Sequence, residues 1–311
     1  MIPTTNLTGG LLLLAALLAG CAERSTLWEE YSQDGLSAYS VGQYQEAEIF
    51  FTDALEEAER GGKVDERLAT SLNNLATAYT ALGRYGGSEA LYRRALAIRE
   101  NLYGFEDTVV ASTLSSLGDT YRLLGRYNEA ETALLRSLII REKKLGRDHP
   151  DVAMTLNNLA ALYRDQDRLA EALEAAERVV IIRQAALKST DPLLATSLNN
   201  LAAIHGALGR REKAESEYMQ ALRIREVSLG PDHPDVAVTL NNIATLKLFA
   251  GEYDEAEMLV KRALDIQQRN LPDDHPDVAV PLRNYAAVMR ATGRDAEATI
   301  LEKQARAIER R

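Results

Sequence analysis

Apolar and small residues recur along this chain at the spacing of three to four positions that is typical of α-helices. The residues at 240, 243, 244 and 247 fall on one helical stripe, as do those at 72, 75, 76 and 79. A second run with the same spacing begins at Tyr253. The sequence has no run of alternating Val, Ile or Tyr that would predict a strand. The pattern therefore predicts an all-α chain.

This helical pattern repeats every 42 residues. The pentapeptide LNNLA at 72 recurs, in varied form, at 114, 156, 198, 240 and 282. A turn position keeps the same step, at Gly83, Gly125, Asp167, Gly209, Gly251 and Gly293. Glycine suits the left-handed conformation that often ends a helix. We expect seven two-helix units, near residues 30–62, 68–104, 110–146, 152–188, 194–230, 236–272 and 278–311.

A histidine flanked by two aspartates precedes several of the predicted helices. Such stretches occur at 146–153, 230–237 and 272–279. In the second, Asp232 or His233 can accept a hydrogen bond from a backbone N–H at the helix start, and Pro234 suits the first turn. Equivalent points on successive packed helices lie at least ~8–10 Å apart, too far for the histidines to converge on one ion. We interpret these stretches as helix caps and predict neither a metal site nor a catalytic one.

The repeated side-chain pattern resembles that of the tetratricopeptide repeat. It reads Leu-x-x-Leu-Ala-x-x-Tyr, then Gly-Arg-Tyr-x-Glu-Ala-Glu, and is complete or nearly so in residues 72–95 and 114–137. The 42-residue period and the LGxDHPDVAxTLNNLA signature are similar to the repeats of kinesin light chains and their bacterial relatives. The resemblance implies a right-handed α-solenoid of about seven helix-turn-helix units. It also implies a concave face that binds an extended peptide or a partner helix.

Some positions depart from the repeated pattern. Ser88 stands where the other units have alanine, and Gly86 and Gly87 should weaken the start of that helix by roughly 0.5–1 kcal/mol each. His205 and Lys247 replace the tyrosine of the first helix. We expect His205 to be a packing residue.

The face of the first helices that does not belong to the core stripe carries the candidate binding residues. Four asparagines form a row on it: Asn73, Asn157, Asn199 and Asn241. An amide both donates and accepts, so the row could hold a peptide backbone. Four arginines on the same face suit acidic side chains or a terminal carboxylate: Arg122, Arg164, Arg283 and Arg290. The second asparagines, at 74, 158, 200, 242 and 284, are expected only to bond to the neighbouring repeat. The alternative is that the four asparagines of the row recur only because the repeat sequence recurs, and that they have no binding role.

The start of the chain has the composition of a secretory leader. Residues 1–20 contain no charged side chain, and Leu11–Ala19 is an apolar run too short to span a bilayer, which needs ~20 residues. The following Leu-Ala-Gly-Cys resembles the cleavage box of bacterial lipoproteins, although residues 1–6 lack the usual Lys or Arg. The resemblance implies a signal peptide over 1–20, lipid attachment at Cys21, a short tether over 21–29 and a solenoid over 30–311.

Two readings of the compartment follow from this leader. Because Ala22 is not aspartate, a lipoprotein would be expected at the periplasmic face of the outer membrane of a bacterial envelope, by analogy with the best-known sorting rule. The alternative is a soluble cytoplasmic protein with an accidental leader. Cys21 is the single cysteine, so no internal disulfide can form.

Charge and motifs narrow the function. The net charge of −10 has the wrong sign for a general phosphate-backbone binder, so no nucleic acid is expected. Gly61-Gly62-Lys63 lacks the other residues of a phosphate loop, and no other catalytic motif occurs. We expect a membrane-anchored, non-enzymatic scaffold without cofactors or a small-molecule substrate, which binds a protein or peptide in its groove. The alternative is a structural or assembly subunit of an envelope complex, such as a pilus or secretion system, that uses its convex face and edges.

Overall fold

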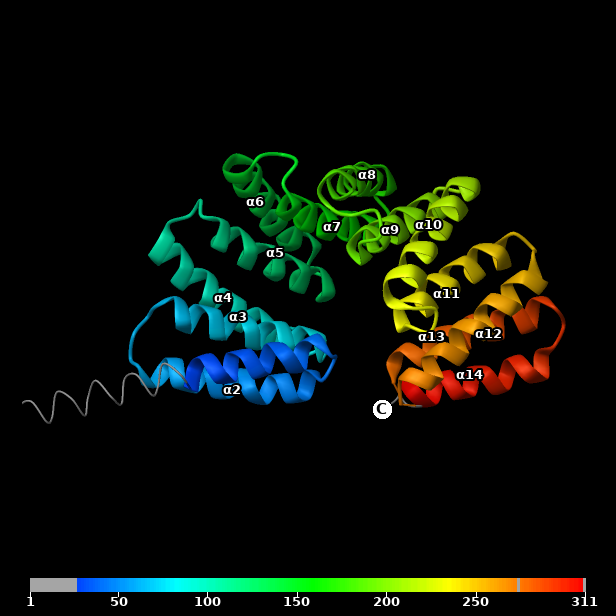
Figure 1. Ribbon diagram of the computed structural model, residues 1–311, viewed down its shortest axis with the longest axis horizontal. Coiled ribbons are helices and arrows are strands. Elements are labelled where there is room, and N and C mark those ends of the chain that lie inside the picture. The colour runs from blue at the N-terminus through cyan, green and yellow to red at the C-terminus, as the bar shows by residue number, and fades with distance from the viewer. Residues whose placement is uncertain (1–26, 273–274, 310–311) are drawn as a thin grey trace, which may run out of the picture. The chain divides into compact units, whose positions relative to one another are not determined.

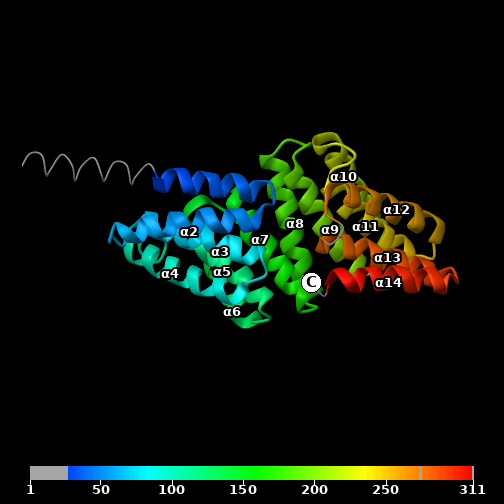
Figure 2. The same cartoon turned by 90° about the horizontal axis from the view of Figure 1, so that it is seen from below.

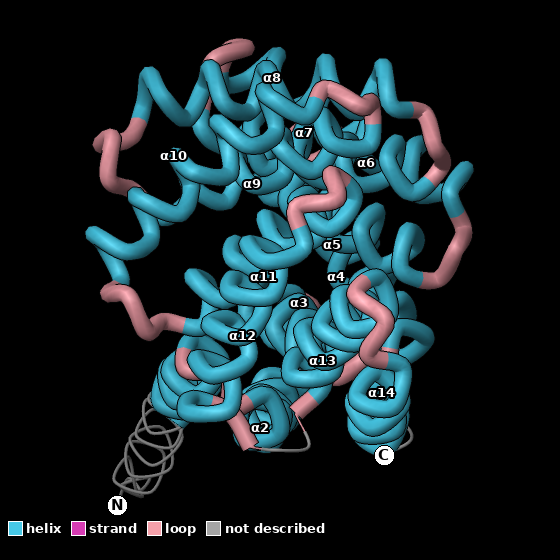
Figure 3. The backbone as a smooth tube through the Cα atoms, turned by 90° about the vertical axis from the view of Figure 1, so that its right-hand side faces the viewer, coloured by secondary structure: helices cyan, strands magenta, loops and turns pink. Residues whose placement is uncertain are grey.

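The computed structural model describes residues 27–272 and 275–309. The predicted signal peptide and Cys21 lie outside these residues. Within them the chain consists of helices joined by short loops, without a strand (Figure 3). No helix in these ranges is long and apolar enough to cross a membrane. The predicted all-α solenoid of helix pairs is confirmed, because fourteen helices, counting residues 27–40, form seven successive pairs.

The chain divides into two compact units, Met1–Arg147 and Asp148–Arg311 (Figure 1). Unit 1 contains the helix over 27–40, α2 (Tyr44–Arg60), α3 (Glu66–Ala81), α4 (Tyr85–Tyr103), α5 (Thr108–Leu123) and α6 (Tyr127–Leu145). Unit 2 contains α7 (Pro150–Asp165), α8 (Leu169–Ala186), α9 (Pro192–Ala207), α10 (Arg211–Leu229), α11 (Pro234–Phe249), α12 (Tyr253–Asn270), α13 (Pro276–Ala291) and α14 (Asp295–Glu309).

The first helix begins earlier than the sequence pattern predicted. Residues 27–29, which the predicted tether included, are helical. Trp28 explains this extension, because its indole Nε1 donates a 2.8 Å hydrogen bond to Ser71 Oγ of α3. The Arg67 guanidinium lies 5.3 Å from the centre of the indole ring. Trp28 is therefore a packing residue that joins the first two pairs.

The histidine-aspartate stretches are helix caps, as predicted. The side chain of His233 accepts the backbone N–H of Asp235 at its Nδ1, 3.1 Å away. His149 and His275 cap α7 and α13 in the same way, and Asp107 and Asp191 take this role where the histidine is missing. Of the two candidates for the cap of α11, Asp232 and His233, the histidine therefore provides it. No group of three His, Cys, Asp or Glu side chains in the described ranges could hold a metal ion.

The turn inside each helix pair has the left-handed backbone that the glycine positions predicted. Gly125 has φ 73°, and the N–H groups of Gly125 and Arg126 donate to the carbonyls of Arg122 and Tyr121. Asp167 takes the same role with φ 59° and without glycine. A short polar side chain such as aspartate tolerates this region better than most, so the turn is preserved.

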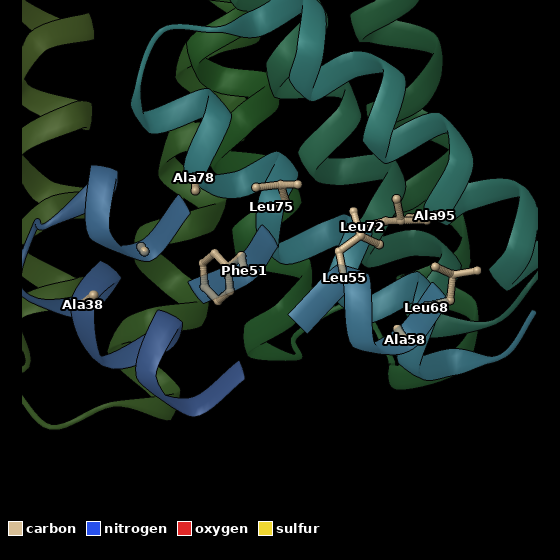
Figure 4. Close-up of a cluster of buried hydrophobic side chains, with 10 residues drawn as sticks. Ala38, Phe51, Leu55, Ala58, Leu68, Leu72, Leu75, Ala78 and Ala95 are labelled. Carbon is tan, nitrogen blue, oxygen red and sulfur yellow. The ribbon is translucent and has the colours of Figure 1, made fainter. Parts of the chain in front are cut away.

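The apolar stripes of neighbouring pairs form the core. In unit 1, Phe51 and Leu55 of α2 pack with Leu72 and Leu75 of α3 (Figure 4), and Leu72 is completely buried. Alanines at the small positions, such as Ala76, have no exposed surface. These residues let the helices approach closely, as ridges-into-grooves packing requires.

The slot that usually holds tyrosine carries polar groups in two pairs of unit 2. His205 is 2% exposed, and its Nδ1 lies 2.8 Å from Glu217 Oε2. Lys247 is equally enclosed, and three glutamates surround its Nζ at 2.6–3.1 Å: Glu215, Glu252 and Glu255. Burial alone would lower the pKa of Lys247, but the bonds to Glu215 and Glu255 raise it. Both side chains are accommodated because each has an anionic partner.

Buried arginines near the ends of second helices connect neighbouring pairs. Arg225 of α10 is 4% exposed and donates from Nη1 to Thr239 Oγ1 at 2.7 Å and to the Asp235 carbonyl at 2.9 Å, both on α11. Its Nη2 reaches Thr196 Oγ1 of α9 at 3.3 Å. The guanidinium of Arg225 therefore joins two successive first helices, and that of Arg99 likewise bonds to α3 and α5. We call these side chains the arginine column: Arg99, Arg141, Arg183 and Arg225.

Three members of the arginine column donate to a hydroxyl group of the next first helix or the preceding one, and Arg99 also pairs with Glu66 at 2.7 Å. Arg183 Nη1 donates to Ser197 Oγ at 2.7 Å, and Arg99 Nη1 donates to Thr113 Oγ1 at the same distance. Burial lowers the pKa of Arg183 and of Arg225, although a guanidinium remains protonated at neutral pH. At the next step of the period, Gln267 replaces arginine and Pro281 replaces the hydroxyl residue. At this junction the two positions change together, whereas Ser71 of α3, which has no arginine opposite it, accepts the indole N–H of Trp28.

We predict that Arg225 and Thr239 are energetically coupled. In urea unfolding, Arg225→Met and Thr239→Val should each lower the unfolding free energy. A double-mutant cycle should give an interaction of about 1–3 kcal/mol, since a hydrogen bond to a buried charge is lost. Arg223→Met is the control, because Arg223 is exposed on the same helix and should change stability by less than about 0.5 kcal/mol. Strictly additive effects at 225 and 239 would contradict the coupling.

We further predict opposite effects at the adjacent glycines of α4. A Cβ on Gly86 would meet nothing within 4 Å, so Gly86→Ala should raise stability by about 0.5–1 kcal/mol through helix propensity. A Cβ on Gly87 would lie 2.7 Å from Tyr79 Cδ2, so Gly87→Ala should lower stability despite the same gain in propensity. Thermal unfolding of the two variants measures the difference. Equal stabilisation by both would show that Tyr79 does not require the glycine.

Candidate binding groove on the first helices

The first helices of neighbouring pairs approach each other more closely than the second helices do. In unit 2, α9 contacts α11 and α11 contacts α13. One surface of these first helices carries Asn157, Asn199 and Asn241, which the sequence pattern assigned to binding. We call this surface of α7, α9, α11 and α13 the inner face.

In unit 2, the second asparagines Asn200, Asn242 and Asn284 bond to the neighbouring repeat, as expected. Asn200 Nδ2 donates to Asn157 Oδ1 at 2.9 Å, and Asn242 Nδ2 donates to Asn199 Oδ1 at 3.1 Å. Asn284 Nδ2 continues the series to Asn241 Oδ1 at 3.0 Å. In unit 1 the corresponding amide–amide bond to Asn73 cannot form, because its donor position is occupied by Ser116 instead of asparagine. These bonds form an asparagine ladder along the inner face.

The asparagine ladder changes what the first asparagines can offer a ligand. Their amide oxygens already accept a bond, and Asn199 and Asn241 are only 8% and 6% exposed. Asn157 and Asn73 are half-buried. Among the described residues, the NH₂ groups of Asn157, Asn199 and Asn241 donate to no protein acceptor. The amide oxygens that were expected to bind a peptide backbone are thus used inside the protein. Only the amide NH₂ groups remain for such a ligand.

The four candidate arginines are each paired with a carboxylate of the chain itself. Arg122 Nε lies 2.9 Å from Asp119 Oδ1 in unit 1. In unit 2, Arg290 Nε lies 2.8 Å from Glu302 Oε1, and Arg283 pairs with Glu309. The bond to Glu302 raises the pKa of Arg290. Arg164 has the loosest pair, 3.5 Å from Asp165 Oδ1, and its side chain is 42% exposed. The positive charge expected on this face is therefore partly neutralised, least so at Arg164.

An apolar pocket, which the sequence did not predict, opens between α9, α10 and α11. Its volume is about 300 Å³, and its lining residues are Ala203, Gly206, Ala207, Tyr218, Asn242, Thr245, Leu246 and Phe249. Gly206 leaves room there, since an added Cβ would have its nearest neighbour at 3.9 Å. Phe249 stands at the rim with 86% of its surface exposed. We call this cavity the Phe249 pocket.

The buried side of the Phe249 pocket is formed by Tyr218, which is 5% exposed. Burial raises the pKa of Tyr218 to about 12, and the positive charge of Arg164 partly opposes this rise. Arg164 therefore acts electrostatically on the phenol from the preceding first helix. The sequence features that could have indicated this pocket are the small residues at 203 and 206 and the phenylalanine at 249, where the other units have Ala, Leu, Asp or Ser.

Models of the tetratricopeptide repeat match residues 68–108, 109–185, 193–269 and 244–311. The crystal structure of BtubC (BKLC) from P. vanneervenii is 26% identical, with a TM-score of 0.59 over 74% of this chain and 91% of that chain. A putative kinesin light chain from Podosopora anserina with nearly identical TPR-like repeats is 27% identical, with a TM-score of 0.55 over 66% of this chain and 97% of that chain.

Aspartyl phosphate phosphatase F from Bacillus subtilis shares the fold at 17% identity, with a TM-score of 0.69 over 98% of this chain and 76% of that chain. The comparison with curated proteins found no match. The family models cover most of residues 68–311, and the helix pairs, the left-handed turns and the small core positions agree with them. The chain belongs to the tetratricopeptide repeat family.

Proposed function

We propose that this protein is a membrane-anchored scaffold that binds an extended segment of a partner protein along the inner face of unit 2. The Phe249 pocket carries the proposal. Its volume of about 300 Å³ is at the lower end of the range for ligand pockets, which suits one large apolar side chain. An 86% exposed phenylalanine beside such a cavity is the kind of aromatic anchor that often dominates an interface.

The asparagine ladder supports an extended partner. The amide N–H groups of Asn157, Asn199 and Asn241 can donate to carbonyl oxygens of a peptide backbone without regard to its side chains. Arg164, with its weak internal pair, offers a contact to a carboxylate beside the pocket. The binding segment would thus place an apolar side chain in the Phe249 pocket. The partner is a protein, and the proposed role requires neither catalysis nor a cofactor.

Filling the Phe249 pocket should abolish partner capture without harming the fold. Gly206→Leu should occupy the cavity with its own side chain, and leucine favours a helix more than glycine does. Phe249→Ala should remove the rim. Proteins captured from detergent-solubilised membranes by the wild type, identified by mass spectrometry, should be lost from both variants.

Gly86→Leu is the matched control for this experiment. It introduces the same side chain at a helical glycine of unit 1 where nothing lies within 4 Å of the added Cβ. Circular dichroism verifies the fold of each variant. Capture that survives both Gly206→Leu and Phe249→Ala would refute the groove. It would favour an assembly subunit of an envelope complex that binds through its outer faces and edges.

The membrane anchor of the proposal rests on Leu18-Ala19-Gly20-Cys21 and the apolar run before it. Lipidation at Cys21 with more than one acyl chain would give stable attachment, whereas a single chain binds only marginally. Ala22 supports a place at the periplasmic face of the outer membrane.

We predict that Cys21→Ser abolishes lipidation and leaves an uncleaved or mislocalised chain whose repeats still fold. The wild type should have the mass of a chain that starts at a lipid-modified Cys21, and it should partition into the detergent phase. Intact-mass spectrometry and phase separation measure both properties. Cleavage after Gly20 and membrane fractionation of the Cys21→Ser protein would overturn the anchor while leaving the groove open to its own test.

A further inference from the structure

One edge of unit 1 displays a group of exposed apolar side chains. It includes the start of the helix at residue 27, the loop between α2 and α3, and the loop between α4 and α5, which lie at the left-hand end of unit 1 in Figures 1 and 2. We call it the tether edge. Its exposed apolar residues are Leu27, Val64, Leu102, Tyr103 and Phe105.

Contacts with α6 hold the α4–α5 loop of the tether edge in place. The guanidinium of Arg136 donates from Nη2 to the Phe105 carbonyl at 3.1 Å and lies 5.7 Å from the centre of the Phe105 ring. Lys143 Nζ, near the end of α6, lies 2.6 Å from Glu106 Oε2 in the same loop. Phe105 is nevertheless 67% exposed, and Val64 is 62% exposed. Several exposed apolar residues on one edge can mark an interaction site, whereas single exposed residues do not.

The tether edge is not a general property of the repeat. At the positions equivalent to Phe105, the chain has Arg147, Ser189 and Pro231. At those equivalent to Val64, it has Glu106, Asp148, Thr190 and Asp232. Except for Pro231, the loops of the other pairs therefore have polar or charged residues at the two most exposed places. The apolar character belongs to the pairs that immediately follow the start of the chain.

Chain length indicates what covers the tether edge. Leu27, at this edge, follows Cys21 by six residues, which span at most about 20 Å when fully extended. A lipid on Cys21 would therefore keep the edge near the headgroups. Aromatic side chains such as Tyr103 favour the membrane interface. Trp28 would suit that zone best, but it is bonded to Ser71 inside the fold.

Two lysines at the tether edge suit lipid headgroups, although Glu29, Glu30 and Asp65 at the same edge carry the opposite charge. Lys63 adjoins Val64, and Lys144 follows the lysine that pairs with the α4–α5 loop. Both lysines are exposed, and Lys144 also acts electrostatically on Glu106. Such side chains attract anionic headgroups at short range. We propose that the tether edge rests on the bilayer, with Val64 and Phe105 inserted at the interface. This inference rests on the proposed lipid anchor at Cys21.

The test uses three tryptophan probes in the full chain, each in a Trp28→Phe background. Val64→Trp and Phe105→Trp report on the tether edge. Val41→Trp is the matched control, because Val41 is 69% exposed at the opposite end of α2, a 17-residue helix of about 25 Å. The lipidated proteins are reconstituted into vesicles of phosphatidylethanolamine and phosphatidylglycerol that contain doxyl-labelled acyl chains. Circular dichroism verifies each fold.

We expect lipid-borne doxyl groups to quench the emission at 64 and 105, with a blue shift and protection from aqueous iodide. The emission at 41 should remain open to iodide and unaffected by the lipid quencher. Iodide quenching alike at all three positions would overturn the proposal. Protection from iodide without lipid quenching would also overturn it, because a protein surface would then cover the edge.

The anchor and the edge can fail separately. Intact-mass spectrometry of the same preparations decides whether Cys21 carries lipid. If it does not, the Cys21 thiol is coupled to a maleimide lipid in the vesicles, and the three probes are measured again. The contact of the tether edge with the bilayer is thereby tested whether or not Cys21 is found to carry lipid.

Discussion

A pair of helices is too small to bury its own apolar stripe, and this constraint shapes nearly every contact in the chain. Leu72 and Phe51 are buried only because successive pairs stack. The polar contacts obey the same rule. Arg225 bonds to hydroxyl groups of two successive first helices, so its charge is enclosed only when three helices are in place. A buried guanidinium without its acceptors would be costly, so the arginine column favours one register of the stack over its alternatives.

The same stacking limits what the inner face can offer a partner. In unit 2, Asn157, Asn199 and Asn241 give their oxygens to the next repeat, which leaves only their amide N–H groups for a ligand. Carboxylates of the chain likewise pair with Arg122, Arg283 and Arg290. A partner that bound the inner face of unit 2 would therefore contact the groups that stacking does not use, which are the amide N–H groups of the asparagine row and the Phe249 pocket. The pocket exists because α9 carries small side chains at a place where the stack does not need large ones.

Periodicity made the helix pairs, the left-handed turns and the capping histidines predictable, since each depends on residues close in sequence. The bond from Asn200 to Asn157 was also predictable in kind, because a repeated amide next to a repeat boundary has few other partners. The acid partner of Arg290 and the arginine column were not foreseen. Arg225 and Thr239 are 14 residues apart on different helices, and their contact depends on rotamers and on the tilt between pairs. The Phe249 pocket escaped prediction because it is an absence of side-chain volume, which no motif records.

The junction before the last helix pair lacks the guanidinium. Gln267 is 4% exposed there, its Oε1 has no hydrogen-bond partner in the described residues, and Pro281 offers no hydroxyl. An unsatisfied buried acceptor costs about 1–3 kcal/mol. A linear array frays from its ends, so α13 and α14 separate from the stack at a lower free energy than an interior pair would. Gly206 and Phe249 both precede this junction. A fluctuation that releases the terminal pair would therefore remove the α13 part of the inner face and the bond from Asn284 Nδ2 to Thr245 Oγ1, while the helices that line the Phe249 pocket stay in the array.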